Sequence, residues 1–323
     1  MSAGPILVAG GSGMAGLGVL GAIEKGLPSA SVRATYNSTA PAGIFPGTEW
    51  VKADLTTREG CKKAVWGCGS AILVAANTGG ASAAMANPAH QVTDNIVMDA
   101  LLLESLHEAG VSRVVYVSSA TVYQETEGRI KEGDLDWNKD PHPAYLGVGW
   151  AKRSAEKLCW FWHSKYGMEI VVARASNIYG PFAKFNPATS NFIPAIVRKA
   201  VDGMDPFEVW GSPDVSRDVI FSEDFGSAVL ALYNAGGVKY NVFNLGTGMP
   251  VTVNQVVLAA LGAAEHKPSK IVYSGPVGAV VRQRVLDCSK LFDATGWTPK
   301  FSLRDGIAAT VEWWRENGRV WKK

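Results

Sequence analysis

The stretch Ile6-Leu7-Val8-Ala9-Gly10-Gly11-Ser12-Gly13-Met14-Ala15-Gly16 decides the fold of this chain. Its apolar start predicts a buried strand, its glycines predict a tight turn, and the apolar residues that follow predict a helix. Glycines let a backbone approach a pyrophosphate closely, and a helix N-terminus offers free N–H groups and the positive end of its dipole. A glycine turn alone is also an ordinary strand-to-helix connection, but here both flanking elements are in place. We therefore expect a dinucleotide-binding turn, with contacts from Gly10, Gly11, Ser12, Gly13, Met14 and Gly16.

Beyond this turn, short apolar runs alternate with helical stretches through the first half of the chain, at 5–9, 31–36, 70–76, 113–118 and 169–174. Such alternation is typical of a mostly parallel sheet covered by helices on both faces. After Arg174 the pattern loosens, with helical patterns at 192–203, 223–234, 253–261 and 305–316. We predict an α/β fold: a Rossmann-type doubly wound parallel sheet with a smaller C-terminal substrate-binding lobe. The expected division is 1–175 for the dinucleotide-binding domain, with a segment near 218–246 returning to it, and 176–217 with 247–323 for the lobe.

Composition narrows the class of function. The 323 residues include 31 basic and 29 acidic side chains without a basic run, so nucleic acid is not an expected partner. The four cysteines have no Cys-x-x-Cys spacing and the five histidines form no spaced set, so we predict no metal site. The chain starts without a charged leader, and no apolar run approaches the roughly 18 to 20 residues that span a bilayer. We expect no membrane contact and a cytoplasmic location.

The second predicted strand bears on the choice of cofactor. About twenty residues after the glycines, where NAD-binding proteins place an acidic residue on the ribose, the chain reads Val32-Arg33-Ala34-Thr35-Tyr36. Arg33 there favours the 2′-phosphate of NADP; if it is only an arginine exposed on an edge strand, NAD is the alternative. Asp54 and Leu55 follow the third strand and suit the adenine end, although an aspartate there is also a common helix cap.

Several motifs along the chain resemble those of the extended short-chain dehydrogenases/reductases that act on nucleotide sugars. In order, they are the glycine turn, Asp54-Leu55, Ala75-Ala76-Asn77-Thr78-Gly79-Gly80, Asn95, Ser118-Ser119-Ala120-Thr121-Val122-Tyr123 and Asn177-Ile178-Tyr179-Gly180-Pro181. The serine motif resembles that of UDP-galactose 4-epimerase. The segments that start at Thr78, Phe185 and Val209 resemble GDP-fucose synthase. The resemblance implies cofactor contacts from Ala75, Ala76, Asn77 and Asn95, a sugar contact from Thr78, and a homodimer.

The same resemblance implies a reacting centre. Ser119 would hydrogen-bond the reacting oxygen, Thr121 would lie beside the sugar, and Lys152 would hold the nicotinamide ribose. The family places a tyrosine four residues before this lysine, because a phenol beside a cation can exchange protons near neutral pH. Here that residue is Val148, which cannot exchange a proton.

Tyr145 is seven residues before Lys152, which is about 10 Å along a regular helix. It could take the role of the phenol only if the helix starts late and the preceding loop folds back. A bound water or the sugar itself are the alternatives.

Other residues point to the substrate and to the limits of the resemblance. Arg217 and Asn177 match positions that contact a diphosphate, a role that suits the bidentate, charge-assisted bonds of a guanidinium. Thr121 and Phe182 stand where GDP-fucose synthase has its acid/base cysteine and histidine, so its full activity is not expected. Further substrate contacts are expected from Trp210, Arg284 and Arg282.

The sequence thus predicts an NAD(P)-dependent enzyme that transforms a nucleotide-activated sugar, with epimerisation through a transient keto intermediate as the first choice. A reductase or dehydratase acting on such a sugar is an alternative. So is a catalytically silent dinucleotide-binding sensor, because Val148, Thr121 and Phe182 together depart from the catalytic pattern.

Overall fold

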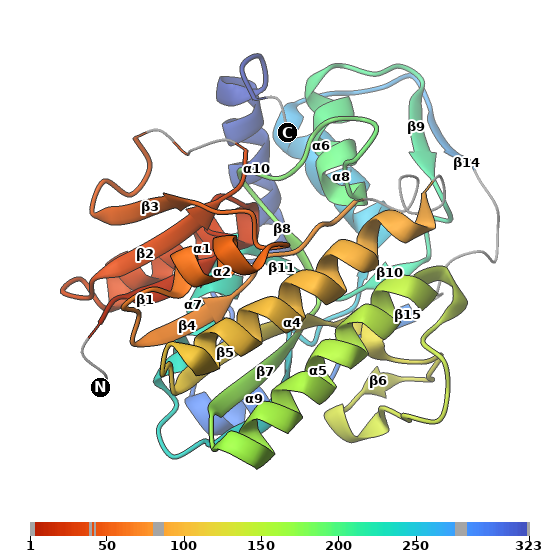
Figure 1. Ribbon diagram of the computed structural model, residues 1–323. Helices are drawn as coiled ribbons and strands as arrows, with labels where there is room; N and C mark the ends of the chain where they lie inside the picture. Colours follow the sequence, from red (N-terminus) through yellow and green to blue (C-terminus); the bar gives the residue numbers. More distant parts are fainter. Residues whose placement is uncertain (1–3, 39–40, 42, 80–86, 275–282, 322–323) are drawn as a thin grey trace.

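A seven-stranded, all-parallel sheet runs through the larger lobe of the computed structural model (Figure 1). The structure describes residues 4–38, 41, 43–79, 87–274 and 283–321. The strand order is β12-β7-β5-β4-β1-β2-β3, so the chain moves outward from β1 in one direction and then in the other, and the predicted doubly wound fold is confirmed. These strands are β1 (Ile6–Ala9), β2 (Val32–Tyr36), β3 (Thr48–Lys52), β4 (Ser70–Leu73), β5 (Arg113–Ser119), β7 (Glu169–Ala175) and β12 (Tyr240–Leu245).

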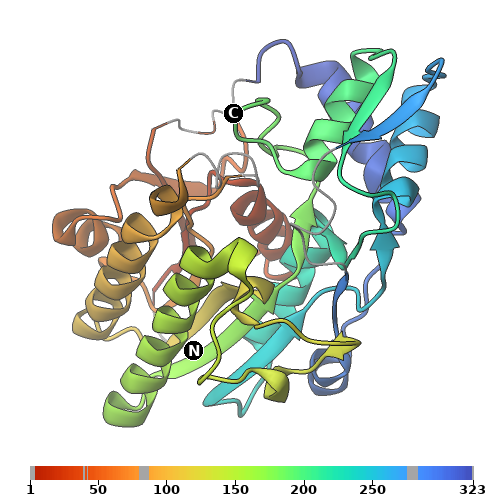
Figure 2. The ribbon, with the colours of Figure 1, turned by 90° about the vertical axis from the view of Figure 1, so that its right-hand side faces the viewer.

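Helices cover both faces of this sheet, and side chains alternate between two cores. In β1, Ile6 and Val8 face the core beneath α1 (Met14–Gly26) and α7 (Ser222–Asn234). Leu7 and Ala9 face the other core. That second core lies beneath α2 (Arg58–Val65), α4 (Thr93–Glu108) and α5 (Leu146–Tyr166), which gather on one side of the sheet in Figure 2. Burial on both faces explains why these strands are continuous apolar runs.

Two glycines bring α1 and α7 into close contact. A Cβ added to Gly226 would lie 2.0 Å from the carbonyl oxygen of Gly18, and one added to Gly18 would lie 2.3 Å from that of Ser222. The helices therefore cross backbone to backbone, which no residue with a side chain would allow.

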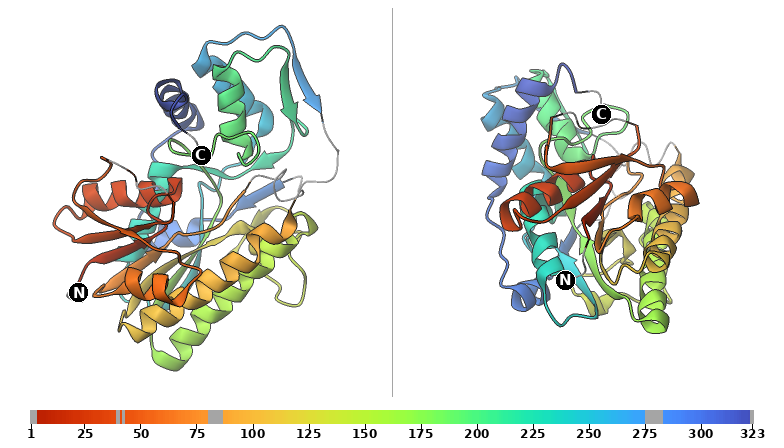
Figure 3. Two further views of the ribbon diagram at one scale, coloured as in Figure 1. Left: turned by 45° about the horizontal axis from the view of Figure 1, so that its top comes forward. Right: turned by 60° about the vertical axis from the view of Figure 1, so that its left-hand side comes forward.

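The smaller lobe has its own core and stands beside the sheet (Figure 3). Its helices pack around buried aromatic side chains such as Phe185 and Phe207. The helices are α6 (Phe192–Val201), α8 (Val253–Ala264) and α10 (Leu303–Asn317), and the longer strands are β9 (Phe207–Trp210) and β14 (Ile271–Ser274). Short strands β13 (Val251–Thr252), β10 (Ser216–Arg217), β15 (Gln283–Leu286) and β6 (Arg129–Ile130) form a small sheet in that order.

The chain returns from the smaller lobe to the large sheet. Strand β11 (Val219–Phe221) pairs with β8 (Asn177–Tyr179), α7 follows, and β12 then joins the sheet beside β7. One later helix, α9 (Ser289–Thr295), also packs against α7 and β12, although its residues fall in a range expected for the smaller lobe. Short 3-10 turns are η1 (Pro88–Gln91), η2 (Ala120–Val122), η3 (Glu132–Asp134) and η4 (Pro143–Tyr145).

Within the described part of the chain, no helix combines the length and the apolar character needed to cross a membrane.

Candidate active site

The glycine turn between β1 and α1 is built for close backbone approach. Gly10 has a φ of 87°, in the left-handed region, and its N–H donates to Thr35 Oγ1 at 2.8 Å. A Cβ on Gly16 would lie 2.3 Å from the carbonyl oxygen of Gly10, so only glycine fits there. Gly13 is the N-cap of α1 and makes no side-chain cap, which leaves the first N–H groups of the helix facing the turn. This cradle fits the pyrophosphate of a dinucleotide.

Arg33, which was expected to bind a 2′-phosphate, makes its contacts away from this cradle. It is the second residue of β2, and Thr35, two residues on, is the one that contacts the turn. The Arg33 Nε donates to Glu49 Oε2 at 2.9 Å, and its Nη1 bonds to the carbonyl oxygens of Ala64 and Trp66. These contacts occupy the guanidinium that was expected to bind a 2′-phosphate.

Asp54 lies between the end of β3 and the start of α2, as expected for a residue at the adenine end. Its Oδ1 accepts hydrogen bonds from the backbone N–H and the hydroxyl of Thr56, at 3.0 and 2.6 Å, and these bonds lower the pKa of the carboxyl. Leu55 beside it is buried. The carboxylate therefore already stabilises the turn into α2, and a ligand contact would be additional to that role.

The loop after β4 is pinned by side chains from two other elements. Asn95, fully buried on α4, accepts from the Asn77 backbone N–H at 2.8 Å and donates to the Asn77 carbonyl at 3.0 Å. Lys184, from the segment before α6, donates to the Thr78 carbonyl at 2.5 Å. The structure thus brings the expected contacts Ala75, Ala76, Asn77 and Thr78 to the edge of the sheet where the strands end, while Gly80 lies outside the described residues.

Ser119 and Lys152 come together at the end of β5. Ser119 is the last residue of the strand and the N-cap of η2, and its Oγ accepts from the Thr121 backbone N–H at 3.2 Å. The buried Lys152 donates to the carbonyl oxygen of Val117, two residues before Ser119, at 3.3 Å. The Thr121 hydroxyl is buried and has no hydrogen-bond partner among the described residues. A buried hydroxyl without a partner suits a ligand oxygen.

Helix α5 starts at Leu146, directly after Tyr145, so the helix does not begin late. All seven residues from Leu146 to Lys152 are helical, and Val148 lies one turn before the lysine. The Tyr145 ring instead packs on Arg284, whose guanidinium carbon is 4.7 Å from the ring centroid. A hydrogen bond also links the Tyr145 and Arg217 side chains. The phenol thus points to the arginines.

Arg217 and Arg284 form a buried cationic pair on the neighbouring strands β10 and β15, where they are register partners. Among described residues, no carboxylate lies within ion-pair distance of either one, and Nη2 of Arg284 has no hydrogen-bond partner. Burial lowers the pKa of Arg284 to about 10, an effect that Tyr145 opposes and the charge of Arg217 adds to. Buried cations without counter-charges are costly, so this pair fits an anionic ligand.

The other expected substrate contacts lie around this pair. Asn177 on β8 is exposed, and its Nδ2 donates to the Asp218 carbonyl, next to Arg217, at 2.9 Å. Trp210 ends β9 with about half of its surface exposed. Arg282 lies outside the described residues.

Some residues near the site were not singled out by the sequence. His142 is half-buried at the start of η4, and burial together with Arg284 and Arg217 lowers its pKa below the ordinary histidine value. Lys184 contacts the loop after β4, and burial lowers its pKa. Asp99 and Tyr116 lie against Lys152. The sequence motifs include none of these four residues, because each is a single polar residue in a helix, strand or loop without a recognisable pattern around it.

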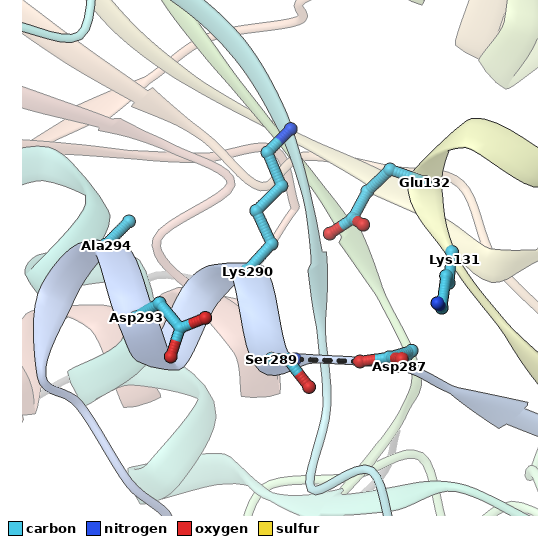
Figure 4. Close-up of a pocket in the computed structure, with 7 residues that line it drawn as sticks. All are labelled: Lys131, Glu132, Asp287, Ser289, Lys290, Asp293 and Ala294. Atoms are coloured by element: carbon cyan, nitrogen blue, oxygen red, sulfur yellow. Dashed lines mark hydrogen bonds between the residues drawn. The ribbon is translucent and has the colours of Figure 1, made fainter.

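A hollow of about 640 Å³ lies away from these residues, between η3 and α9 (Figure 4). Its one hydrogen bond drawn in the figure runs from the Ser289 backbone N–H to Asp287 Oδ1, at 3.0 Å. None of the expected catalytic or binding residues lines it. Among the described residues, no three His, Cys, Asp or Glu side chains come close enough to hold a metal ion.

Known proteins with a similar sequence are nucleotide-sugar enzymes. The chain is 29% identical over 274 residues to GDP-mannose 3,5-epimerase from Arabidopsis thaliana, covering 83% of this chain and 71% of that protein. It is 28% identical over 259 residues to GDP-L-fucose synthase 1 from the same plant, covering 76% of each. Among solved structures, UDP-glucose 4-epimerase from Thermotoga maritima superposes with a TM-score of 0.84 over 97% of this chain and 99% of that one, at 24% identity, and so shares the fold.

Residues 6–246 match the NAD dependent epimerase/dehydratase family, a range that starts at β1 and ends just after β12. The match therefore covers the complete large sheet, the glycine turn, Ser119, Lys152 and Arg217. Three quarters of the chain thus carry the family pattern, and the resemblance seen in the motifs is confirmed. The chain belongs to the NAD-dependent epimerase/dehydratase family.

Proposed function

We propose that this protein epimerises a nucleoside-diphosphate sugar through a transient keto intermediate. The observation that carries the proposal is the buried pair Arg217 and Arg284, which has no carboxylate partner among the described residues. Two adjacent guanidiniums match the charge and geometry of a diphosphate. The relatives named above act on GDP-sugars, and the solved neighbour was determined with UDP-glucose.

The residues at the end of β5 would handle the sugar. A bound nicotinamide cofactor supplies reversible hydride transfer. Ser119 would hydrogen-bond the hydroxyl oxygen on the ring carbon that is oxidised to the ketone and then reduced again, and the Thr121 hydroxyl, which has no partner among the described residues, would bind a neighbouring sugar hydroxyl. Lys152 would hold the nicotinamide ribose and keep a positive charge beside the reacting oxygen.

The proton would be moved by a water or by the sugar itself. Val148 offers no titratable group, and Tyr145 is committed to the arginine pair two helical turns from Lys152. This geometry favours the two routes that do not use Tyr145. Tyr145 would then serve the diphosphate end of the site.

We propose NAD(H) rather than NADP(H) as the cofactor. The basis for NADP was a free Arg33, and the guanidinium is bonded to Glu49 and to two backbone carbonyls. No other arginine or lysine is present in the described residues from 34 to 38, where β2 ends. Two of the structural neighbours, MoeE5 and the Thermus thermophilus UDP-glucose 4-epimerase, were determined with NAD.

A panel of UDP-, GDP-, dTDP- and CDP-sugars, incubated with NAD and followed by NMR of the products, tests the function. We expect conversion of at least one sugar to an epimer and its loss in Ser119→Ala. Products that have lost a hydroxyl group as water would make the protein a dehydratase, and reduced products would make it a reductase. Tight NADH binding without conversion of any sugar would favour the silent sensor. The motive for that alternative is that position 148 is a valine and not a tyrosine.

We also propose that the protein is a homodimer joined through α4 and α5. These helices lie side by side on the outside of the sheet (Figure 1), and apolar side chains lie exposed on both. The exposed apolar side chains are Ile96, Val97, Trp150, Trp160, Phe161 and Tyr166. Exposed apolar side chains that gather on one part of a surface are typical of protein–protein interfaces.

A further inference from the structure

Three polar side chains from three elements meet beneath the end of β5. Lys152 Nζ, from α5, donates to the Tyr116 hydroxyl of β5 at 2.8 Å. That hydroxyl donates in turn to Asp99 Oδ2 of α4 at 2.7 Å. The ammonium and the carboxylate are 3.5 Å apart, and all three side chains are buried. They form a closed group of one cation, one phenol and one carboxylate.

A buried carboxylate at this place needs an explanation. Asp99 is 2% exposed, and it lies among buried apolar residues of α4 such as Met98, Leu102 and Leu106. Burial raises the pKa of Asp99, while the charge of Lys152 and the hydrogen bond from Tyr116 act to lower it. Burying an ion pair seldom stabilises a fold more than apolar residues of the same size would. The pair therefore suggests a function.

We explain the buried carboxylate by the phenol that is missing one helical turn before Lys152. In the Tyr-x-x-x-Lys arrangement the lysine serves a phenol one helical turn away, and here that position is Val148. Asp99 of α4 and Tyr116 of β5 are the residues that contact the ammonium instead. Together with the Val117 carbonyl they fix its position two residues before Ser119.

We propose that Asp99 is a positioning residue, which balances the charge of Lys152 and, through Tyr116, holds its ammonium where it binds the nicotinamide ribose. This inference rests on the proposed function, since it assumes that Lys152 contacts the cofactor. Asp99 itself touches neither cofactor nor substrate. Its effect is transmitted by Lys152, so removing either member of the pair should have the same consequence.

A double-mutant cycle on NADH affinity tests this coupling. We expect Asp99→Asn and Lys152→Met each to weaken NADH binding, measured by fluorescence titration, by about 10- to 100-fold, the loss typical of a charge-assisted contact. The double variant should bind NADH no more weakly than Lys152→Met alone, because the two residues act as one unit. Circular dichroism melting of each variant establishes that it is folded.

Tyr116→Phe is the second variant, and it decides the matter if Asp99→Asn does not fold. It should weaken NADH binding, because Lys152 then loses the hydroxyl that accepts its hydrogen bond and is held by Asp99 only through the direct 3.5 Å contact. Tyr123→Phe is the matched control: that phenol is equally buried and bonds to Arg174 and Asn244, away from Lys152, so NADH affinity should not change.

The inference is overturned if folded Asp99→Asn, or folded Tyr116→Phe where the first variant does not fold, binds NADH like the native protein while Lys152→Met does not. Additive losses in the double variant would overturn it as well. Failure of the native protein to bind NADH at all would instead contradict the proposed function.

Discussion

At the scale of single residues, the anion site gives the sharpest prediction. Arg217→Ala should weaken UDP binding by about 10- to 100-fold, because a buried charge-assisted contact is lost. NADH binding should stay the same, since the glycine cradle is formed by other elements, between β1 and α1. Isothermal titration calorimetry measures both, with the exposed Arg304→Ala as the control. An equal loss for both ligands would indicate a folding defect rather than a diphosphate site.

Tyr145→Phe distinguishes a role of this phenol in diphosphate binding from a role in proton transfer. Because the ring packs on Arg284 and its side chain bonds to Arg217, we expect less than a tenfold loss of turnover and a weaker affinity for UDP. A general acid or base would show a loss of about 100- to 10,000-fold. A loss of that size with unchanged cofactor affinity would assign proton transfer to Tyr145.

Arg33→Ala tests the choice of cofactor. The guanidinium ties β2 to Glu49 on β3 and to the carbonyls of Ala64 and Trp66 at the end of α2, so its removal should lower the melting temperature. The ratio of NADPH to NADH affinity should stay the same within about twofold, far below the 10- to 100-fold of a lost charge-assisted contact. A selective loss of NADPH binding, measured by fluorescence titration, would support a contact between Arg33 and the 2′-phosphate.

The positions of the expected site residues were predictable where a motif fixes the spacing and not elsewhere. Ser119 and Lys152 are embedded in such motifs, and the structure brings both to the end of β5. The position of Arg33 came from counting about twenty residues after the glycines, and counting does not tell which residue ends the strand. Asp99 gave no local signal, because its partners are 17 and 53 positions away in the sequence.

At the scale of elements, the crossing of α1 and α7 depends on glycine. Gly18→Ala should destabilise the fold by about 1–3 kcal/mol, because its Cβ would lie 2.3 Å from the Ser222 carbonyl. Gly21→Ala on the same helix is the matched control, since its nearest neighbour would be 3.6 Å away, at ordinary contact distance. That variant should be about 0.5–1 kcal/mol more stable. Urea unfolding of both measures the difference, and equal effects would contradict the close crossing.

The elements themselves were largely predictable from local pattern. The helical patterns at 223–234 and 305–316 agree closely with α7 and α10, because amphipathic spacing is a local property. The pairing of β10 with β15 was not predictable, because it joins two short segments separated by α7, β12 and α8. The same pairing brings Arg217 and Arg284 together, so the anion site required the structure even though both residues had been singled out.

At the scale of the whole molecule, the exposed face of α4 and α5 predicts two chains per particle. Val97→Arg and Phe161→Arg place charges at the two ends of that face, where both native side chains are exposed and apolar. We expect analytical ultracentrifugation to show a dimer for the native protein and a monomer for the double variant, because a buried charge without a partner is strongly unfavourable. Trp66→Glu is the control, since this side chain is 78% exposed just after α2, on neither helix of the proposed interface, and its loss should leave the dimer intact. Each variant should still bind NADH, because the site proposed for it is at the ends of the strands rather than on the outer helix face. A native monomer, or a double variant that remains dimeric, would place the interface elsewhere or remove it.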